Sequence, residues 1–208
     1  PENAPQPDEA GYQEFVSTFV KDIISISEGR ALVLFTSYRM LEKTYEDVIP
    51  SFSERTINIM KQGSKDRAKL LYSFNEDTAS VLFATASFWE GIDAPGETLK
   101  VVIICRLPFK VPTGPIFQAR MEAIENQGGN SFFQLALPEA VMKLKQGFGR
   151  LMRRQSDRGV VLILDSRIVR KSYGGFFLQS LPETVRSIKS EDGLLTDVES
   201  FLYPAVIE

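Results

Sequence analysis

Short runs of consecutive apolar residues recur along the chain, and stretches with an apolar residue at every third or fourth position separate them. Five runs are rich in β-branched residues: RALVLF (30–35), TINIM (56–60), SVLFAT (80–85), LKVVIIC (99–105) and GVVLIL (159–164). Runs that are apolar at every position are typical of strands in a sheet covered on both faces. Helical spacing between them predicts parallel crossovers, so we expect a three-layer α/β domain with a mostly parallel central sheet.

The stretches between the runs carry helix signals. Apolar residues at helical spacing follow the first and second runs: Met40, Leu41, Tyr45 and Val48, then Leu70, Leu71 and Phe74. We expect the first helix to end at Gly29 and Ser64 to cap the helix after the second run. One or two helices are expected over 131–155, with Pro138 in the first turn of the second.

The ends of the chain differ from the middle. Residues 1–11 are rich in proline and acidic side chains, and we expect them to be a linker to a domain that covers 12–208. Phe176, Phe177 and Leu178 are expected to pack a helical tail over 171–208. Because the chain opens on proline, we expect it to be a piece of a longer protein.

Composition narrows the class of protein. The 208 residues are 43% hydrophobic and 25% charged with a net charge of −3, which is typical of a soluble globular domain and gives no global argument for nucleic acid. Cys105 is the single cysteine, so no internal disulfide forms and a reducing, cytoplasmic setting is expected. No run approaches the roughly 20 apolar residues of a membrane span, and we expect no membrane partner.

Four polar loops follow apolar runs directly. They are TSYR (36–39), KQGSKDR (61–67), TASFWEGIDAPG (85–96) and DSRIVRK (165–171). Ligands of open α/β sheets bind beyond the carboxyl ends of the strands, where these loops are expected. Their hydroxyl, amide and basic groups are suited to holding an anion.

The segment QGFGRLMRR (146–154) combines glycines and arginines in a stretch with helical spacing. On a helix Gln146, Arg150 and Arg153 align on one face, with Gly149 close by. Glycine allows close approach of a phosphate, and guanidinium stabilises charge on a transferred phosphoryl group. The alternative is a solvated helix face, since residues 143–171 as a whole are basic and Arg154 is consistent with a plain surface charge.

The rest of an ATP site is missing from the sequence. It contains no G-x-x-x-x-G-K-[ST] phosphate loop, no acidic run that follows a strand and no histidine. The chain therefore offers half of an ATP site, with arginines for a nucleotide bound elsewhere, and no metal site of its own is expected.

Ordered motifs identify a resemblance. QGFGRLMR (146–153) resembles motif VI of superfamily 2 helicases, and ATASFWEGIDAPG (84–96) resembles motif V of the DinG/XPD-like branch. LVLFTSYRML (32–41), RLPFKVPTGP (106–115), DSRI (165–168) and KSYGGFFLQSLP (171–182) resemble further segments of that branch, in the right order. The resemblance covers nearly all of residues 12–185.

The resemblance implies the second RecA-like motor domain of an ATP-dependent DNA helicase that acts on single-stranded DNA. ATP and Mg²⁺ would be bound mainly by a first RecA-like motor domain of the same protein, which is also where an iron–sulfur cluster would lie. The isolated chain is then expected to be inactive.

The resemblance also implies roles for particular residues. Arg150 and Arg153 would reach the γ-phosphate, with Gln146 and Gly149 shaping the approach. Residues of motif V would couple nucleotide to DNA: Glu90, Gly91 and Asp93. Two loops would contact the DNA backbone through Thr36, Ser37, Tyr38, Gln62 and Gly63.

Several of these residues have structural alternatives. Phe88 and Trp89 are either base-stacking side chains or core residues under motif V. Thr36, Ser37 and Tyr38 either touch DNA or cap the following helix. Asp165 and Arg167 form either a structural or a functional ion pair, and Cys105 is expected to be inert and buried.

The competing functions are a motor domain and a non-catalytic RecA-like interaction module. An independent nucleotide-binding enzyme is disfavoured, because no Gly-rich fingerprint follows a strand.

Overall fold

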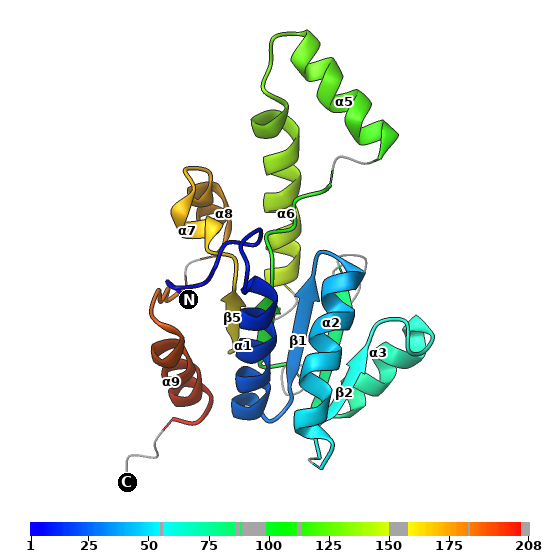
Figure 1. Ribbon diagram of the computed structural model, residues 1–208, viewed down its shortest axis with the longest axis vertical. Helices are drawn as coiled ribbons and strands as arrows, with labels where there is room; N and C mark the ends of the chain where they lie inside the picture. The colour runs from blue at the N-terminus through cyan, green and yellow to red at the C-terminus, as the bar shows by residue number, and fades with distance from the viewer. Residues whose placement is uncertain are drawn as a thin grey trace.

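In the residues that the structure describes, five parallel strands lie between two layers of helices. The computed structural model describes residues 1–54, 56–85, 88, 99–111, 114–149, 158–182 and 184–204. The strands are β1 (Ala31–Phe35), β2 (Asn58–Lys61), β3 (Ser80–Thr85), β4 (Val101–Ile104) and β5 (Val160–Ile163). Each lies within one of the five apolar runs, apart from a one-residue extension of β2, so the prediction of a parallel three-layer domain is confirmed (Figure 1).

The strands pair in the order β2-β3-β1-β4-β5, and every pairing is parallel. The chain therefore starts in the centre of the sheet, moves to one edge, and crosses back over β1 to reach the other. The registers of Phe35 with Thr85 and of Leu34 with Ile104 place the carboxyl ends of β1, β3 and β4 at one edge of the sheet. The loops after these strands are thereby brought together.

Helices cover both faces of the sheet. In the described residues the α-helices are α1 (Tyr12–Ser27), α2 (Tyr38–Val48), α3 (Arg67–Glu76), α5 (Pro115–Asn126), α6 (Leu137–Phe148), α7 (Arg167–Arg170), α8 (Gly174–Ser180) and α9 (Glu191–Leu202). A 3-10 turn, η1 (Ile49–Phe52), follows α2, and a π-helical turn, η2 (Phe132–Ala136), leads into α6. Helices α1, α2 and α9 pack on one face, and α3, α6 and α8 on the other.

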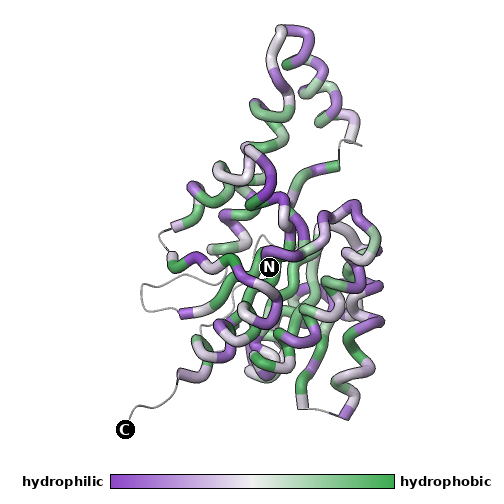
Figure 2. Tube along the Cα trace, turned by 60° about the vertical axis from the view of Figure 1, so that its left-hand side comes forward, coloured by the Kyte–Doolittle hydropathy of each residue, from purple (hydrophilic) through white to green (hydrophobic). Residues whose placement is uncertain are grey.

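Two hydrophobic clusters follow from this layering. Alternate residues of β1 contribute to opposite clusters, Val33 to the first and Leu34 to the second. All five residues of β1 are buried, which is why the run is apolar at every position. Figure 2 shows the apolar strands in the interior and polar residues concentrated on the outer turns. No helix in the described ranges is long and apolar enough to cross a bilayer.

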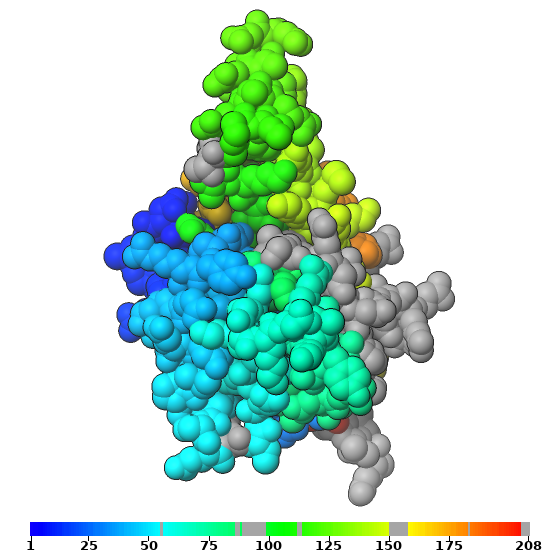
Figure 3. Space-filling model, turned by 90° about the vertical axis from the view of Figure 1, so that its right-hand side faces the viewer, coloured from blue at the N-terminus to red at the C-terminus, as the bar shows by residue number. Residues whose placement is uncertain are grey.

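Helix α5, η2 and the first turns of α6 form an arm that projects beyond the sheet (Figure 1). Phe117 is the only buried residue of α5. Figure 3 shows this arm rising above α2 and α3. Because α5 makes little contact with the core, its position depends on the segments that anchor its ends.

Some local predictions are confirmed and others are wrong. Gly29 follows the end of α1 with a φ of +89°, and Pro138 lies in the first turn of α6. The cap of α3, however, is Asp66, whose carboxylate accepts the N–H of Ala68 at 3.0 Å. Ser64 lies two residues before this cap position, and its hydroxyl donates to the carbonyl of Lys61 in the preceding turn.

The C-terminal predictions also need correction. Phe177 is fully buried as expected, but Phe176 on the adjacent position of α8 is 54% exposed, because one face of this short helix meets the core. The tail is helical in two parts, α8 and α9, and the described residues between them are not helical. Helix α6 ends at Phe148 with Gly149 as its C-cap, and residues 150–155 of the helical stretch expected here lie outside the described residues. Glycine is a poor helix former and a common residue at helix ends.

Candidate nucleic-acid and nucleotide interface

A buried glutamine connects three loops at the carboxyl edge of the sheet. Gln62, directly after β2, accepts the N–H of Thr85 at 2.7 Å and the hydroxyl of Thr85 at 2.9 Å. Its amide N–H donates to the hydroxyl of Tyr38 at the start of α2. These bonds fix the loops after β1, β2 and β3 relative to one another.

The same loops leave polar groups open to solvent. Tyr38 is half exposed, and Ser37 and Gly63 are exposed beside it. Gly63 has a φ of +92° in a turn closed by the N–H of Ser64 and the carbonyl of Lys61, a conformation that favours glycine. Thr36, half-buried, begins this surface at the end of β1. Hydroxyls and main-chain groups thus face outward from a rigid edge.

The structure confirms two of the structural roles considered for these loop residues, those of Ser37 as a helix cap and of Phe88 as a core residue. The hydroxyl of Ser37 accepts the N–H of Met40 at 3.3 Å and caps α2. Phe88 is buried within the second hydrophobic cluster, so it is a core residue rather than a stacking side chain. The guanidinium of Arg67 lies 4.9 Å from the centre of the Phe88 ring. Trp89 lies outside the described residues.

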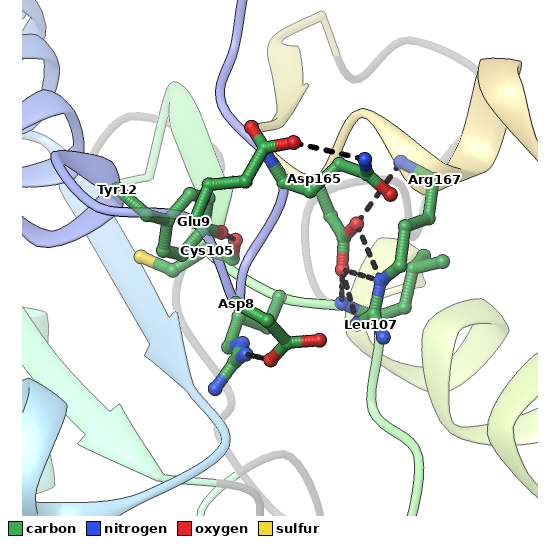
Figure 4. Close-up of polar contacts among 9 residues, drawn as sticks. Asp8, Glu9, Tyr12, Cys105, Leu107, Asp165 and Arg167 are labelled. Carbon is green, nitrogen blue, oxygen red and sulfur yellow. Dashed lines mark hydrogen bonds and ion pairs between the residues drawn. The ribbon is translucent and has the colours of Figure 1, made fainter.

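A carboxylate joins the ends of β4 and β5. Asp165 is fully buried and accepts the main-chain N–H of Leu107 at 2.8 Å. It also accepts two N–H groups of the Arg167 side chain, at 2.9 and 2.7 Å. Figure 4 shows both partners directed at the same carboxylate. Burial lowers the pKa of Arg167, but the hydrogen bonds and charge of Asp165 outweigh this and raise it.

The N-terminal segment covers this cluster. Asp8 pairs with Arg106 at 2.9 Å, and the hydroxyl of Tyr12 donates to the carbonyl of Cys105 (Figure 4). Burial raises the pKa of Tyr12 and of the Cys105 thiol, because both charged forms would lose hydration. Cys105 is therefore buried and un-ionised at neutral pH, as expected.

Aromatic rings fix the segment that follows Leu107. The ring of Phe109 lies 5.7 Å from that of Phe132 in η2 and 5.6 Å from those of Tyr173 and Phe177. Edge-to-face and offset pairs at these distances stabilise a defined arrangement. The base of the arm is thereby tied to α8.

The basic segment 143–171 is not uniformly positive. Arg167 points inward to Asp165, and a guanidinium N–H of Arg170 donates to the carbonyl of Glu2 at 2.9 Å. The guanidinium of Arg158 lies 5.4 Å from the centre of the Phe201 ring. Lys143 and Lys145 on α6 make no such contact in the described part of the chain. Within that part, no group of three or more potential metal ligands comes together.

Comparison with known proteins places this geometry in a family. Residues 20–184 match the family described as "Helicase C-terminal domain". The chain belongs to this family. The helicase C-terminal domain found here is of the DinG/XPD-like type, as its ordered motifs predict.

Two relatives and one solved structure illustrate the match. "ATP-dependent DNA helicase YoaA" of Haemophilus influenzae is 46% identical over 79% of this chain and 25% of its own length. "3'-5' exonuclease DinG" of Bacillus subtilis is 37% identical over 85% of this chain and 19% of its own. The solved structure of S. tokodaii Xpd4 has a TM-score of 0.61 at 18% identity, covering 86% of this chain and 35% of that one, and it supports the RecA-like fold. The chain spans a quarter or less of these two relatives.

The structure describes part of the expected site of this helicase C-terminal domain. Gln146 and Gly149 are exposed at the end of α6. A Cβ at Gly149 would lie 3.4 Å from the carbonyl oxygen of Lys145, an ordinary contact, so the described neighbours do not require a glycine there. The remaining expected residues lie outside the described ranges: Glu90, Gly91, Asp93, Arg150 and Arg153.

The loop after β4 was predicted only as a segment that resembles the family, and none of its residues was predicted as a contact. RLPFK (106–110) follows an apolar run directly, as the four polar loops do, and the same rule would have selected it. The contact of Asp165 with Leu107 has no signal in the sequence, because it depends on β4 and β5 being neighbours.

Proposed function

We propose that this domain is the second RecA-like motor domain of an ATP-dependent DNA helicase and that it contacts single-stranded DNA. The observation that carries the proposal is the loop edge fixed by Gln62, which presents hydroxyl and main-chain groups side by side. Such groups suit contact with a sugar–phosphate backbone without sequence preference. Similarity to the ATP-dependent DNA helicase YoaA of Haemophilus influenzae supports DNA and ATP as the ligands.

On the DNA side, Thr36, Ser37, Tyr38 and Gly63 form the contact surface, and Gln62 supports it from below. Ser37 caps α2 through its hydroxyl, and its exposed position leaves its outer side accessible. Gln62 acts mainly by holding Tyr38 in place, because its own amide is buried and satisfied by Tyr38 and Thr85. The loop is therefore organised before DNA arrives.

On the nucleotide side, Arg150 and Arg153 contact the γ-phosphate of ATP bound to a first motor domain of the same protein. Gln146 and Gly149 shape the approach, and the tolerance of Gly149 for a Cβ among its described neighbours supports a role for the glycine toward a ligand. Residues of motif V couple the nucleotide to DNA: Glu90, Gly91 and Asp93. Mg²⁺, and any iron–sulfur cluster, belong with the first motor domain.

The test measures DNA-stimulated ATP hydrolysis by a protein that joins this domain to its first motor domain. Arg150→Ala and Arg153→Ala should each lower turnover by about a thousandfold, the usual effect of removing an arginine finger. Arg154→Ala is the matched control, since it removes the same charge just beyond the motif, and it should hydrolyse ATP normally.

The competing proposal, a non-catalytic interaction module, gives the opposite result. If both finger variants hydrolyse ATP at the rate of the unsubstituted protein, the motor assignment is refuted. The chain without the first motor domain should show no ATP hydrolysis, because it contains no phosphate loop.

A further inference from the structure

A cleft opens under the arm, next to the loop edge. Its volume is about 520 Å³, within the range of small-ligand pockets. The walls come from the end of β1, the segment after β4, the start of α5 and one turn of α6. The lining residues are Thr36, Pro108, Phe109, Lys110, Val111, Gly114, Ile116, Phe117, Arg120 and Lys143.

The cleft carries an excess of positive charge. Lys110 and Arg120 both pair with one carboxylate, that of Glu139, at 2.7 and 3.3 Å. Lys143 lines the same cleft one turn further along α6, and no carboxylate pairs with it in the ranges that the structure describes. Three cations facing one carboxylate favour an anionic ligand.

The rim of the cleft is apolar and open. Val111 is 70% exposed and Ile116 is 78% exposed, although both are large apolar side chains. Phe117 is buried below them, with the ammonium of Lys110 lying 5.4 Å from the centre of its ring. Proteins that bind single-stranded nucleic acid combine cations that pair with phosphates and side chains against which bases pack. The cations and the exposed apolar rim of this cleft provide both kinds of contact.

The cleft is continuous with the proposed DNA-contacting loop. Thr36 belongs to both, since it begins the loop after β1 and also lines the cleft. Strand β4 is the neighbour of β1 in the sheet, so the segment after β4 lies next along the same edge. A DNA strand that lies over Gln62 and Tyr38 therefore reaches the cleft by continuing in the same direction along the edge of the sheet.

We propose that this cleft is a second contact for single-stranded DNA, in which Lys143 binds a phosphate and Ile116 packs against a base. The proposal rests on the proposed function, because it extends the DNA path from the loop edge. The contacts of Phe109 with Phe177 and of Glu139 with Arg120 anchor the base of the arm beside the cleft.

The test is a salt titration of DNA binding by the 208-residue chain. The probe is a fluorescein-labelled oligodeoxythymidine of about 12 nucleotides, long enough to span a typical single-strand site. Lys143→Gln should weaken binding on the order of fivefold and lower the slope of log affinity against log salt by about 0.7, one phosphate contact. Ile116→Ala should weaken binding without changing the slope, because no charge is lost.

Each variant has a matched control. Lys21→Gln removes the same charge from α1, in the opposite helical layer, and Met142→Ala removes an apolar side chain that is 63% exposed on α6 but does not line the cleft. Both controls should bind DNA as the unsubstituted chain does. Equal thermal midpoints for all four variants would show that folding is unaffected.

Tyr38→Ala separates this proposal from the loop contact. If Tyr38→Ala weakens binding and the cleft variants match their controls, the cleft proposal is overturned while the loop contact stands. If the cleft variants weaken binding and Tyr38→Ala does not, the cleft is supported and the loop contact fails. No binding by the unsubstituted chain at low salt would overturn both.

Discussion

Gly174 and Gly175 open helix α8, and their surroundings differ sharply. A Cβ at Gly174 would lie 1.9 Å from the carbonyl oxygen of Ile168 and 2.6 Å from its carbonyl carbon. A Cβ at Gly175 would meet no atom within 4 Å. Gly174→Ala therefore forces α8 away from α7, whereas Gly175→Ala places a methyl group in open space.

The magnitudes follow from these contacts. Relieving the Gly174 clash needs a movement of about 1 Å, and such overpacking costs about 1–3 kcal/mol or somewhat more when the backbone itself is struck. The movement also loosens Phe177, which is fully buried against Phe109. We expect a loss of about 3 kcal/mol for Gly174→Ala. Gly175→Ala should gain about 0.4–1 kcal/mol, because alanine restricts the unfolded chain and favours helix.

Thermal unfolding followed by circular dichroism distinguishes the two variants. For a chain of this size 1 kcal/mol corresponds to about 2–4 °C. Gly174→Ala should unfold roughly 6–12 °C below the unsubstituted protein, and Gly175→Ala at the same temperature or slightly above it. Equal midpoints for the two variants would refute the close packing of α7 and α8.

Two further predictions concern buried ionisable groups. Asp165→Ala should lower the free energy of unfolding by about 3–5 kcal/mol in denaturant titrations, because Arg167 and the Leu107 N–H lose their buried acceptor; Lys43→Ala, which breaks an exposed pair with Asp47, should cost under about 1 kcal/mol. A similar loss of stability in Asp165→Ala and Lys43→Ala would contradict the role of Asp165 as a buried acceptor for Arg167 and Leu107. Burial raises the pKa of the Cys105 thiol in the folded chain above the value of about 8.5 that a thiol has in an unfolded chain. Below this unfolded pKa the thiol is un-ionised in both states, so its ionisation does not change the free energy of unfolding. Above it the unfolded chain ionises first, and the free energy of unfolding falls by about 1.4 kcal/mol per pH unit. Between about pH 9 and 10, the free energy of unfolding measured in denaturant titrations should fall less steeply with pH for Cys105→Ala than for the unsubstituted chain. Equal slopes for the two proteins would contradict the effect of burial on this thiol.

Sequence alone predicted the strands because their signal is local. A strand covered on both faces is apolar along its length, and β1 and β4 are apolar at every position, while β3 is apolar between Ser80 and Thr85 at its two ends. The ordered motifs identified the family for a related reason, since they depend on short spacings and chain order. Local signals failed where two candidates competed, as when Asp66 rather than Ser64 capped α3.

Tertiary structure decided everything that joins distant segments. The sequence contains Thr36, Ile116 and Lys143, but only the pairing of β1 with β4 and the projection of the arm bring them to one cleft. Gln62 was expected to touch DNA directly, and the fold instead buries it as the link between Tyr38 and Thr85. Apolar spacing specifies which residues turn inward, whereas strand order and helix packing determine which of them meet, because those contacts join residues that are remote along the chain.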